Sequence, residues 1–329
     1  MTVPTADDSD ATNRVQTPAG GLSIPSLGWR LVLLVALGLG LALLLYYPVG
    51  AWRASVIDDD PAFVPSGVEI GQSRAAAVAA QLIRREIDVH GWTPNKPFFL
   101  PASILVAMPS FQTGIAAAVG RFATEMTREL GRPASGAGPA DPDLARAAEL
   151  LGSPPDVWMI DPKAPLARTL STEKQYRNAA RSLEAFNLRL KNGDATYDRG
   201  ATALGDTLEA MAKDLTDAAA TLDGPIAEGG GWFAHGVATL YYNGKGRAYA
   251  SLLILKALGE DDRGLLVARG LDDSWQAMLA SLRQASRPRP WLVMVGGGGS
   301  ALVPDHLAVQ GYHLLMAASR LNDIAEALR

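Results

Sequence analysis

The clearest pattern along the chain is an uncharged apolar segment from Leu31 to Trp52, enclosed by Arg30 and Arg53. As a helix, its 22 residues would extend about 33 Å, enough to cross the hydrocarbon core of a bilayer. Aromatic residues, which favour the headgroup layer, stand near its two ends: Trp29, Tyr46, Tyr47 and Trp52. We therefore predict a transmembrane helix over residues 29–52, with residues 31–52 in contact with the lipid bilayer.

Two other interpretations of this segment have to be weighed. A cleaved signal peptide has a shorter apolar core, about 7–15 residues, followed by a small-residue cleavage site. This run is longer and ends in Tyr46-Tyr47-Pro48. A helix buried in a protein core would carry polar residues on one face, and none occur from Leu31 to Leu45. The pattern favours the uncleaved single-pass anchor.

The residues flanking the segment suggest its orientation. Its basic neighbours are Arg14 and Arg30 before it and Arg53 after it. This slight Lys/Arg bias places the polar residues 1–28, which we predict to be a disordered tail, in the cytoplasm. A linker over residues 53–71 would then lead to a helical domain, residues 72–329, on the periplasmic side of a bacterial inner membrane.

Beyond the linker, apolar residues recur at helical spacing, and Gly- and Pro-rich stretches interrupt them. The predicted helices are Ser73 to His90, Phe111 to Leu130, Asp143 to Leu151, Trp232 to Leu258, Ser274 to Ala285 and Asp305 to Leu328. Candidate sub-boundaries lie near residues 132–142 and 224–231. The fold class is all-α: one N-terminal transmembrane helix followed by a large soluble helical bundle with little or no β structure.

The best-specified pair of helices lies in the middle of the chain. Thr172 and Gln175 fit a capping box at the start of the first helix. Apolar residues then recur every three or four positions from Tyr176 to Leu190, and again from Leu204 to Leu222. Gly193 separates the two stripes, which predicts an antiparallel helical hairpin.

Composition narrows the classes of function. The formal net charge of −4, with no basic stripe, argues against nucleic-acid binding. The chain has no cysteine, which excludes disulfides, zinc–thiolate sites, iron–sulfur clusters and cysteine nucleophiles. We predict no cofactor and no metal site.

Histidines near Gly-rich loops are the weak catalytic candidates. A His–carboxylate pair can act as a general base, so Asp305, His306 and His235 deserve consideration. Adjacent side chains on a helix do not face each other, however. We therefore favour Asp305 as a helix cap and His306 as a residue beside the packing stripe.

Two further local patterns carry weak chemical signals. Residues 296–301, four glycines followed by Ser-Ala, formally fit a dinucleotide fingerprint, but too few residues follow to complete a β-α-β fold. We interpret them as a flexible or tightly turning loop. The carboxylate pairs Asp58-Asp59 and Asp261-Asp262 fall in predicted loops, and we expect them on the solvated surface.

The stretch from Trp92 to Pro101 is unusual for a loop, because it carries three large aromatic residues among three prolines. The aromatic residues, Trp92, Phe98 and Phe99, either plug the helical bundle or form an apolar docking surface near the membrane. We favour the plug.

The strings Trp92-Thr93-Pro94-Asn95 and Met108-Pro109-Ser110-Phe111-Gln112 resemble the bacterial domain-of-unknown-function 2333 family. The likeness continues through Tyr176-Arg177-Asn178-Ala179 to Asp305-His306-Leu307. This resemblance implies an envelope-associated protein with one N-terminal hydrophobic segment. It brings no activity, cofactor or catalytic residue.

These observations favour a non-enzymatic protein anchored in the inner membrane, which scaffolds or docks an unknown envelope partner. A homo-oligomer is compatible with the helical stripes. The alternatives are a helical module that binds lipid or a small ligand through the Phe98-Phe99 region, and an envelope enzyme with His306 or His235 as its base.

Overall fold

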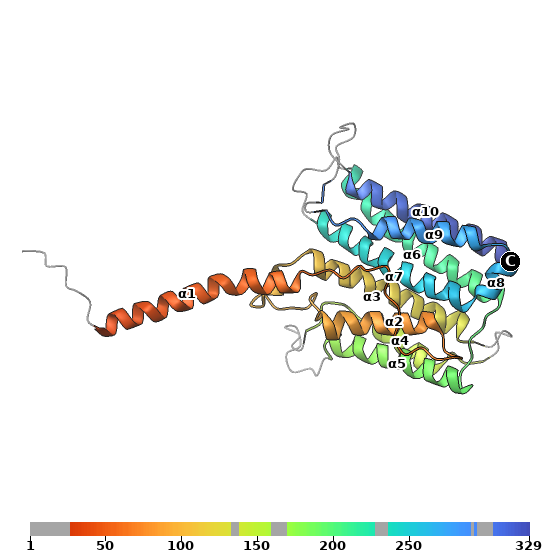
Figure 1. Cartoon of the computed structure of the whole chain (residues 1–329), viewed down its shortest axis with the longest axis horizontal. Helices are drawn as coiled ribbons and strands as arrows, with labels where there is room; N and C mark the ends of the chain where they lie inside the picture. The colour runs from red at the N-terminus through yellow and green to blue at the C-terminus, as the bar shows by residue number, and fades with distance from the viewer. Residues whose placement is uncertain (1–26, 133–137, 159–169, 228–235, 291–292, 295–304) are drawn as a thin grey trace, which may run out of the picture. The chain divides into compact units, whose positions relative to one another are not determined.

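The computed structural model describes residues 27–132, 138–158, 170–227, 236–290, 293–294 and 305–329 (Figure 1). Within these ranges it contains ten α-helices, three short π or 3₁₀ turns and no strand, which confirms the all-α prediction. The described residues divide into two compact units between Tyr46 and Tyr47.

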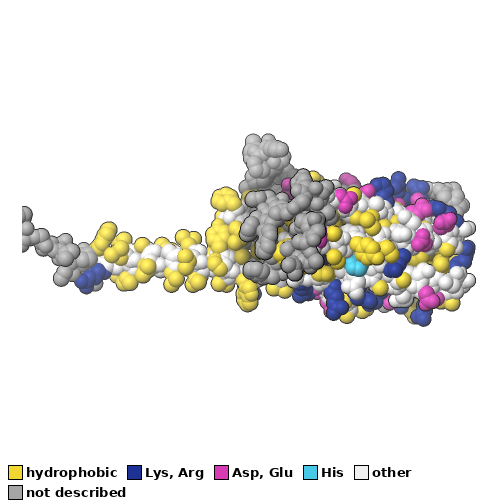
Figure 2. Space-filling view, turned by 90° about the horizontal axis from the view of Figure 1, so that it is seen from above, with side chains coloured by type: hydrophobic (Ala, Val, Ile, Leu, Met, Phe, Trp, Pro, Cys, Tyr) yellow, Lys and Arg dark blue, Asp and Glu magenta, His cyan; other side chains and the backbone are white. Residues whose placement is uncertain are grey.

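The first helix, α1 (Leu27–Ala54), contains the whole apolar segment. Among the described helices it alone is long and apolar enough to cross a membrane. Its leucines are exposed, and Figure 2 shows hydrophobic side chains along its length, with basic side chains near its N-terminal end. A helix that belonged to a protein core would have these side chains covered, so the core-helix interpretation is disfavoured.

The remaining helices form the bundle of the second unit. They are α2 (Arg74–Arg84, continued by a π turn, Arg85–Val89), α3 (Ala107–Glu125, continued by a π turn, Met126–Leu130), α4 (Pro142–Leu151), α5 (Thr172–Asn192), α6 (Ala201–Ala227), α7 (Val237–Asp261), α8 (Arg263–Ala268), α9 (Asp272–Ser286) and α10 (His306–Leu328). Helix α7 is central and packs against α2, α3, α6 and α9. Helix α10 covers α6 and α9, while α4 and α5 cover α2 and α3 on the opposite side (Figure 1).

Local signals fix several helix ends. The Ser73 hydroxyl accepts a hydrogen bond from the Ala76 amide at 3.1 Å, and so caps α2. Gly91, with φ of +74°, follows the end of that helical segment. The Asp305 carboxylate accepts from the Ala308 amide at 2.9 Å and caps α10, as expected.

The predicted helical hairpin is wrong. Helix α5 ends at Gly193, as expected, but it packs against α2 and α4, whereas α6 packs against α10 and α7. After Gly193 the chain leaves α5, and the Asp198 amide donates to the Leu130 carbonyl at the end of α3. Heptad-like spacing identifies the buried face of each helix, but not the helix that covers it.

The predicted capping box is also wrong. Thr172 is the first residue of α5, and its hydroxyl donates to the Pro154 carbonyl at 2.9 Å. The Gln175 side chain donates to the Leu170 carbonyl. Both polar groups therefore bind the chain leading into the helix, in place of each other's backbone.

Helices α3 and α7 touch backbone to backbone. A Cβ atom added to Gly114 would collide with the Asn243 carbonyl, and one added to Gly246 would collide with the Phe111 carbonyl. Glycine at both points lets the helix axes approach more closely than larger side chains allow. This crossing sets the position of α7 in the centre of the bundle.

We expect Gly246→Ala to lower the free energy of unfolding by about 2 kcal/mol, because the added methyl group forces α3 and α7 apart. Gly264→Ala on α8 is the control, since a Cβ there meets no atom within 4 Å. Denaturant unfolding of the detergent-solubilised full chain measures both. Equal effects of the two substitutions would contradict the close crossing.

Candidate functional site

The segment that follows α1, residues 55–72, is irregular but bound along the bundle; we call it the strap. Near its start, the Tyr249 hydroxyl of α7 donates to the Asp60 carbonyl at 2.9 Å. Further along, Gln81 of α2 donates to the Ser66 carbonyl at 2.8 Å and accepts from the Ser66 amide at 2.9 Å. The strap is therefore attached to both helices and is not a free linker.

A buried ion pair fixes the start of the strap. The Lys245 side chain of α7 is fully buried, and its Nζ lies 2.6 Å from the Asp59 carboxylate. The same Nζ donates to the Pro288 carbonyl at 2.8 Å, and Arg289 forms a second ion pair with Asp59. The Asp59 side chain is only 6% exposed, so the prediction that this residue is solvated surface is wrong.

A second cation holds the neighbouring residue of the strap. Arg85, in the π turn after α2, donates to the Glu86 carboxylate at 2.8 Å, to the Tyr249 hydroxyl at 2.9 Å and to the Asp58 carbonyl at 3.0 Å. Its guanidinium also lies over the rings of Phe63 and Tyr249. This turn therefore joins the strap, α2 and α7.

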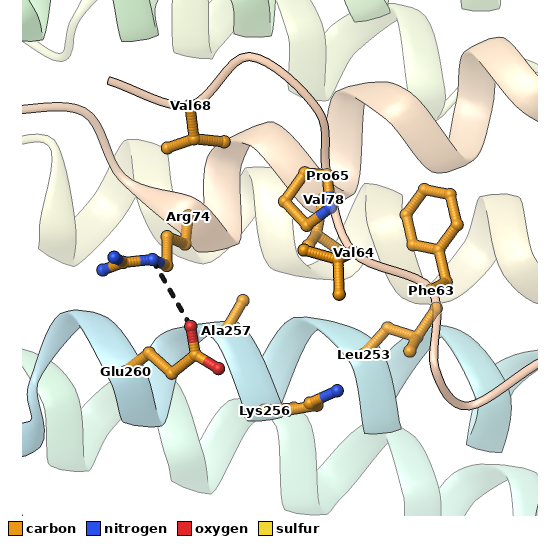
Figure 3. Close-up of a pocket in the computed structure, with 10 residues that line it drawn as sticks. All are labelled: Phe63, Val64, Pro65, Val68, Arg74, Val78, Leu253, Lys256, Ala257 and Glu260. Carbon is orange, nitrogen blue, oxygen red and sulfur yellow. Dashed lines mark ion pairs between the residues drawn. The ribbon is translucent and has the colours of Figure 1, made fainter. Parts of the chain in front are cut away.

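Under the middle of the strap lies a small, mostly apolar cavity. Phe63, Val64, Pro65 and Val68 face α2 and α7 across it, and an ion pair between Arg74 and Glu260, 3.3 Å apart, crosses its rim (Figure 3). Its volume is about 70 Å³, well below the roughly 300–1,000 Å³ of a typical small-molecule site. It is too small for an acyl chain or a cofactor.

A larger, open cleft of about 510 Å³ lies beside Asp59. Arg283, Arg287 and Arg289 line it together with Asp59 and Asp60. The cleft could attract an anion, but Arg283 and Arg287 are exposed side chains. Elsewhere in the described residues, no group of three His, Asp or Glu side chains could hold a metal ion.

In the structure, the catalytic candidates Asp305 and His306 are engaged in contacts that stabilise the fold. The Asp305 carboxylate is occupied in capping α10. The His306 Nδ1 accepts from the Met294 amide at 3.1 Å, and the His306 amide donates to the Met294 carbonyl. His306 also packs edge-on to Tyr241. His235 and the tetraglycine, residues 296–299, lie outside the described residues.

The chain from Trp92 to Val106, which we call the aromatic loop, divides into two parts. Trp92 is 1% exposed, packs edge-on to Tyr176 and donates from Nε1 to the Pro155 carbonyl at 2.8 Å. It is the predicted plug. Phe98 and Phe99 are 84% and 48% exposed, so the plug interpretation is wrong for them. The loop's prolines and hydrogen bonds hold these rings out of the core.

A carboxylate pair that the sequence places on the surface is buried at the end of α7. Asp261 accepts from the Ser73 hydroxyl at 2.8 Å and from the Ala75 amide at 3.1 Å. Asp262 is 4% exposed, and neither of its carboxylate oxygens has a hydrogen-bond partner among the described residues. Burial, reinforced by Asp261, raises the pKa of Asp262 to about 7.

The sequence carried faint signals for these buried charges. Lys245 lies between Gly244 and Gly246 on a face that is buried, and a lysine on a buried face needs a carboxylate. Its partner, Asp59, lies far away along the chain, and no local spacing connects the two. The described structure thus defines a helical bundle with a charged, bound strap and one exposed apolar loop, and it brings together no catalytic constellation within those residues.

Comparison with protein-family models, with curated proteins and with solved structures gave no match to this chain. The resemblance carried by Trp92-Thr93-Pro94-Asn95 and Met108-Pro109-Ser110-Phe111-Gln112 therefore stays a prediction.

We expect Lys245→Met to lower the free energy of unfolding by about 3 kcal/mol, because it leaves the Asp59 carboxylate in a buried site with one exposed cation. The double variant Lys245→Met/Asp59→Leu should recover most of this loss. Lys213→Met, which breaks the exposed pair with Asp217, is the control and should cost less than about 1 kcal/mol. Denaturant unfolding measures all three. A Lys245→Met effect as small as that of the control would contradict the role of the buried ion pair in holding the strap.

The raised pKa of Asp262 predicts how stability depends on pH. The native carboxyl keeps its proton up to about pH 7, while the unfolded one loses it near pH 4, so stability falls across this range and then levels off. Asp262→Asn removes the charge but keeps the shape. At about pH 8 it should raise the free energy of unfolding by up to about 4 kcal/mol, and at about pH 4 by little.

Urea denaturation of both proteins at several pH values tests this expectation. Asp217→Asn, at an exposed site, is the matched control. An Asp262→Asn variant with the same pH profile as the parent would show that the buried carboxyl does not govern it.

Proposed function

We propose that this protein is a single-pass protein of the bacterial inner membrane, whose periplasmic helical bundle acts as a non-enzymatic scaffold for a partner protein. The length and apolar surface of α1 support the anchor. Arg14 and Arg30, the basic residues before the apolar segment, support the orientation. The resemblance to an envelope-associated family supports the compartment.

The clamped strap is the observation that carries the scaffold proposal. A scaffold has to present its surface at a fixed place, whereas a tethered enzyme works equally well on a free linker. Asp59, a few residues after the end of α1, is buried against Lys245, and Asp60 is bound by Tyr249. The bundle therefore begins almost where the proposed anchor ends.

A surface for the partner is offered by α10. Val309, Tyr312 and Leu315 are exposed apolar residues on this helix. Beside them, an open groove of about 230 Å³ lies between α9 and α10, lined by Tyr312, His313 and Met316. Apolar side chains exposed beside a groove are typical of protein-binding surfaces.

The two alternatives have less support. An enzyme that used His306 as its base would need the one lone pair of the neutral imidazole, and that lone pair, on Nδ1, already accepts the hydrogen bond of the Met294 amide. A module that bound a small ligand through Phe98 and Phe99 would need a cavity beside these rings, and the described pockets of about 70, 510, 130, 290 and 230 Å³ are all lined by other residues.

Two lysines placed in the middle of α1, Leu37→Lys and Leu41→Lys, test the anchor. Each costs about 3 kcal/mol at the centre of a spanning helix, so we expect the variant to leave the membrane pellet after carbonate extraction while the parent stays. The double variant Leu37→Ala/Leu41→Ala is the matched control and should stay in the pellet. A mature chain that begins after Trp52, by mass spectrometry, would instead indicate a cleaved signal peptide.

The same membranes test the scaffold. A photo-crosslinking residue at Tyr312 should join the full chain to one reproducible protein in the envelope, and the same residue at Val267, an exposed position on α8, should not. A chain that stays monomeric at both positions contradicts the scaffold. A His306→Ala variant that folds but does not complement a strain deleted for this protein would favour the enzyme.

A further inference from the structure

The second half of the aromatic loop exposes four large apolar side chains within ten residues. Phe98 is 84% exposed, Ile104 is 59% exposed, and Phe99 and Val106 are both 48% exposed. The rings of Phe98 and Phe99 pack edge-on against each other. Exposed apolar side chains grouped in this way are typical of a surface that binds a membrane or another protein.

The loop is held in this shape by its polar base. Asn95 donates to the Val157 carbonyl at 2.9 Å and to the Glu173 carboxylate at 2.7 Å. Lys96 forms an ion pair with the same Glu173 at 3.0 Å. Within the apolar part, the Ser103 hydroxyl donates to the Leu100 carbonyl at 2.6 Å. These bonds stabilise a loop shape that keeps the phenylalanines exposed.

Two contacts fix the height of the loop along α1. The Tyr47 hydroxyl donates to the Phe98 carbonyl at 3.2 Å. One turn further along, Gly50 lies directly against the Pro101 ring, and a Cβ atom there would collide with it. Tyr47 precedes Trp52, the last residue of the apolar segment, by about 7.5 Å of helix. The loop therefore lies beside the last turns of that segment.

We propose that the aromatic loop dips into the interfacial layer of the bilayer that α1 crosses, with Phe98 and Phe99 among the headgroups and upper acyl chains. This inference rests on the proposed function, because it requires α1 to span. A group bound to Tyr47 has to lie at the depth of the membrane surface, where aromatic side chains are favoured. Val49 and Trp52, on the same turns of α1, are further exposed apolar residues, at 51% and 74%.

The polar base fits this placement. Asn95 and Lys96 precede Phe98 in the chain, and both bind Glu173, so the carboxylate at the base of the loop is paired. The bundle then has two attachments to the bilayer, α1 and the loop. Two attachments prevent the bundle from swinging about the end of α1, which a single helix would allow.

The absence of cysteine allows a direct measurement of depth. Three single variants, Phe98→Cys, Leu37→Cys and Val267→Cys, are each labelled with bimane. Each full-length chain is then reconstituted into phosphatidylcholine vesicles. Quenching is compared between nitroxide-labelled lipids and aqueous iodide. Leu37 lies within the proposed span and reports the anchor. Val267, an exposed aliphatic residue on α8, is the matched control for a side chain in water.

We expect the label at Phe98→Cys to be quenched several-fold more strongly by shallow lipid nitroxides than the label at Val267→Cys, and to be shielded from iodide. Because Phe98→Cys removes one of the proposed membrane contacts, Ile104→Cys provides a second site that keeps both phenylalanines and should behave alike.

The outcomes separate the two proposals. Lipid quenching at Leu37→Cys, with only iodide quenching at positions 98 and 104, overturns the loop insertion and leaves the anchor standing. No lipid quenching at Leu37→Cys overturns the anchor and the inference together. Protection of positions 98 and 104 from both quenchers, or disulfide-linked dimers through them, shows that protein covers the loop and also overturns the inference.

Discussion

The buried ammonium group of Lys245 is the constraint on which the arrangement of the chain depends. A cation without water costs several kcal/mol unless a carboxylate lies against it. Asp59 supplies that carboxylate 2.6 Å away, so the strap has to return to α7 as soon as it leaves α1. Once Asp59 is fixed, Asp60 meets Tyr249 and Phe63 lies beneath Arg85, and the apolar strap residues that follow cover α2 and α7.

Helix α7 is held near its middle and at its C-terminal end. Gly246, next to Lys245, brings the backbone of α3 against the middle of the helix. At the C-terminal end, Asp261 accepts hydrogen bonds from Ser73 and from amides in the first turn of α2, where the helix dipole favours a negative charge. The same arrangement destabilises the charged form of Asp262, because its carboxyl is buried without a hydrogen-bond partner among the described residues. Stability of the bundle is therefore coupled to a proton on one carboxyl.

The functional proposals follow from the apolar side chains that the bundle leaves exposed. The chain places an exposed apolar loop beside the last turns of α1, and it binds the base of that loop with Asn95, Lys96 and Glu173. An exposed apolar stripe on α10 leaves room for a protein partner. A membrane contact and a protein contact are the two roles of a scaffold, and neither requires a reactive group.

The sequence by itself determined the features that arise from neighbouring residues. These are the apolar helix α1, the all-α class, the caps at Ser73 and Asp305 and the stop at Gly193. Each depends on contacts within a few residues, which helical spacing and capping chemistry record directly.

Only the tertiary structure decided which distant groups meet. It paired α5 with α2 and α6 with α10, buried Asp59 against Lys245 and Asp262 beside Asp261, and divided the aromatic loop into a buried Trp92 and an exposed Phe98. The hydrophobic effect has no direction, so an apolar stripe does not select its partner. A charge in a predicted loop is solvated or buried according to which helices close over it, and that depends on the packing of the whole chain.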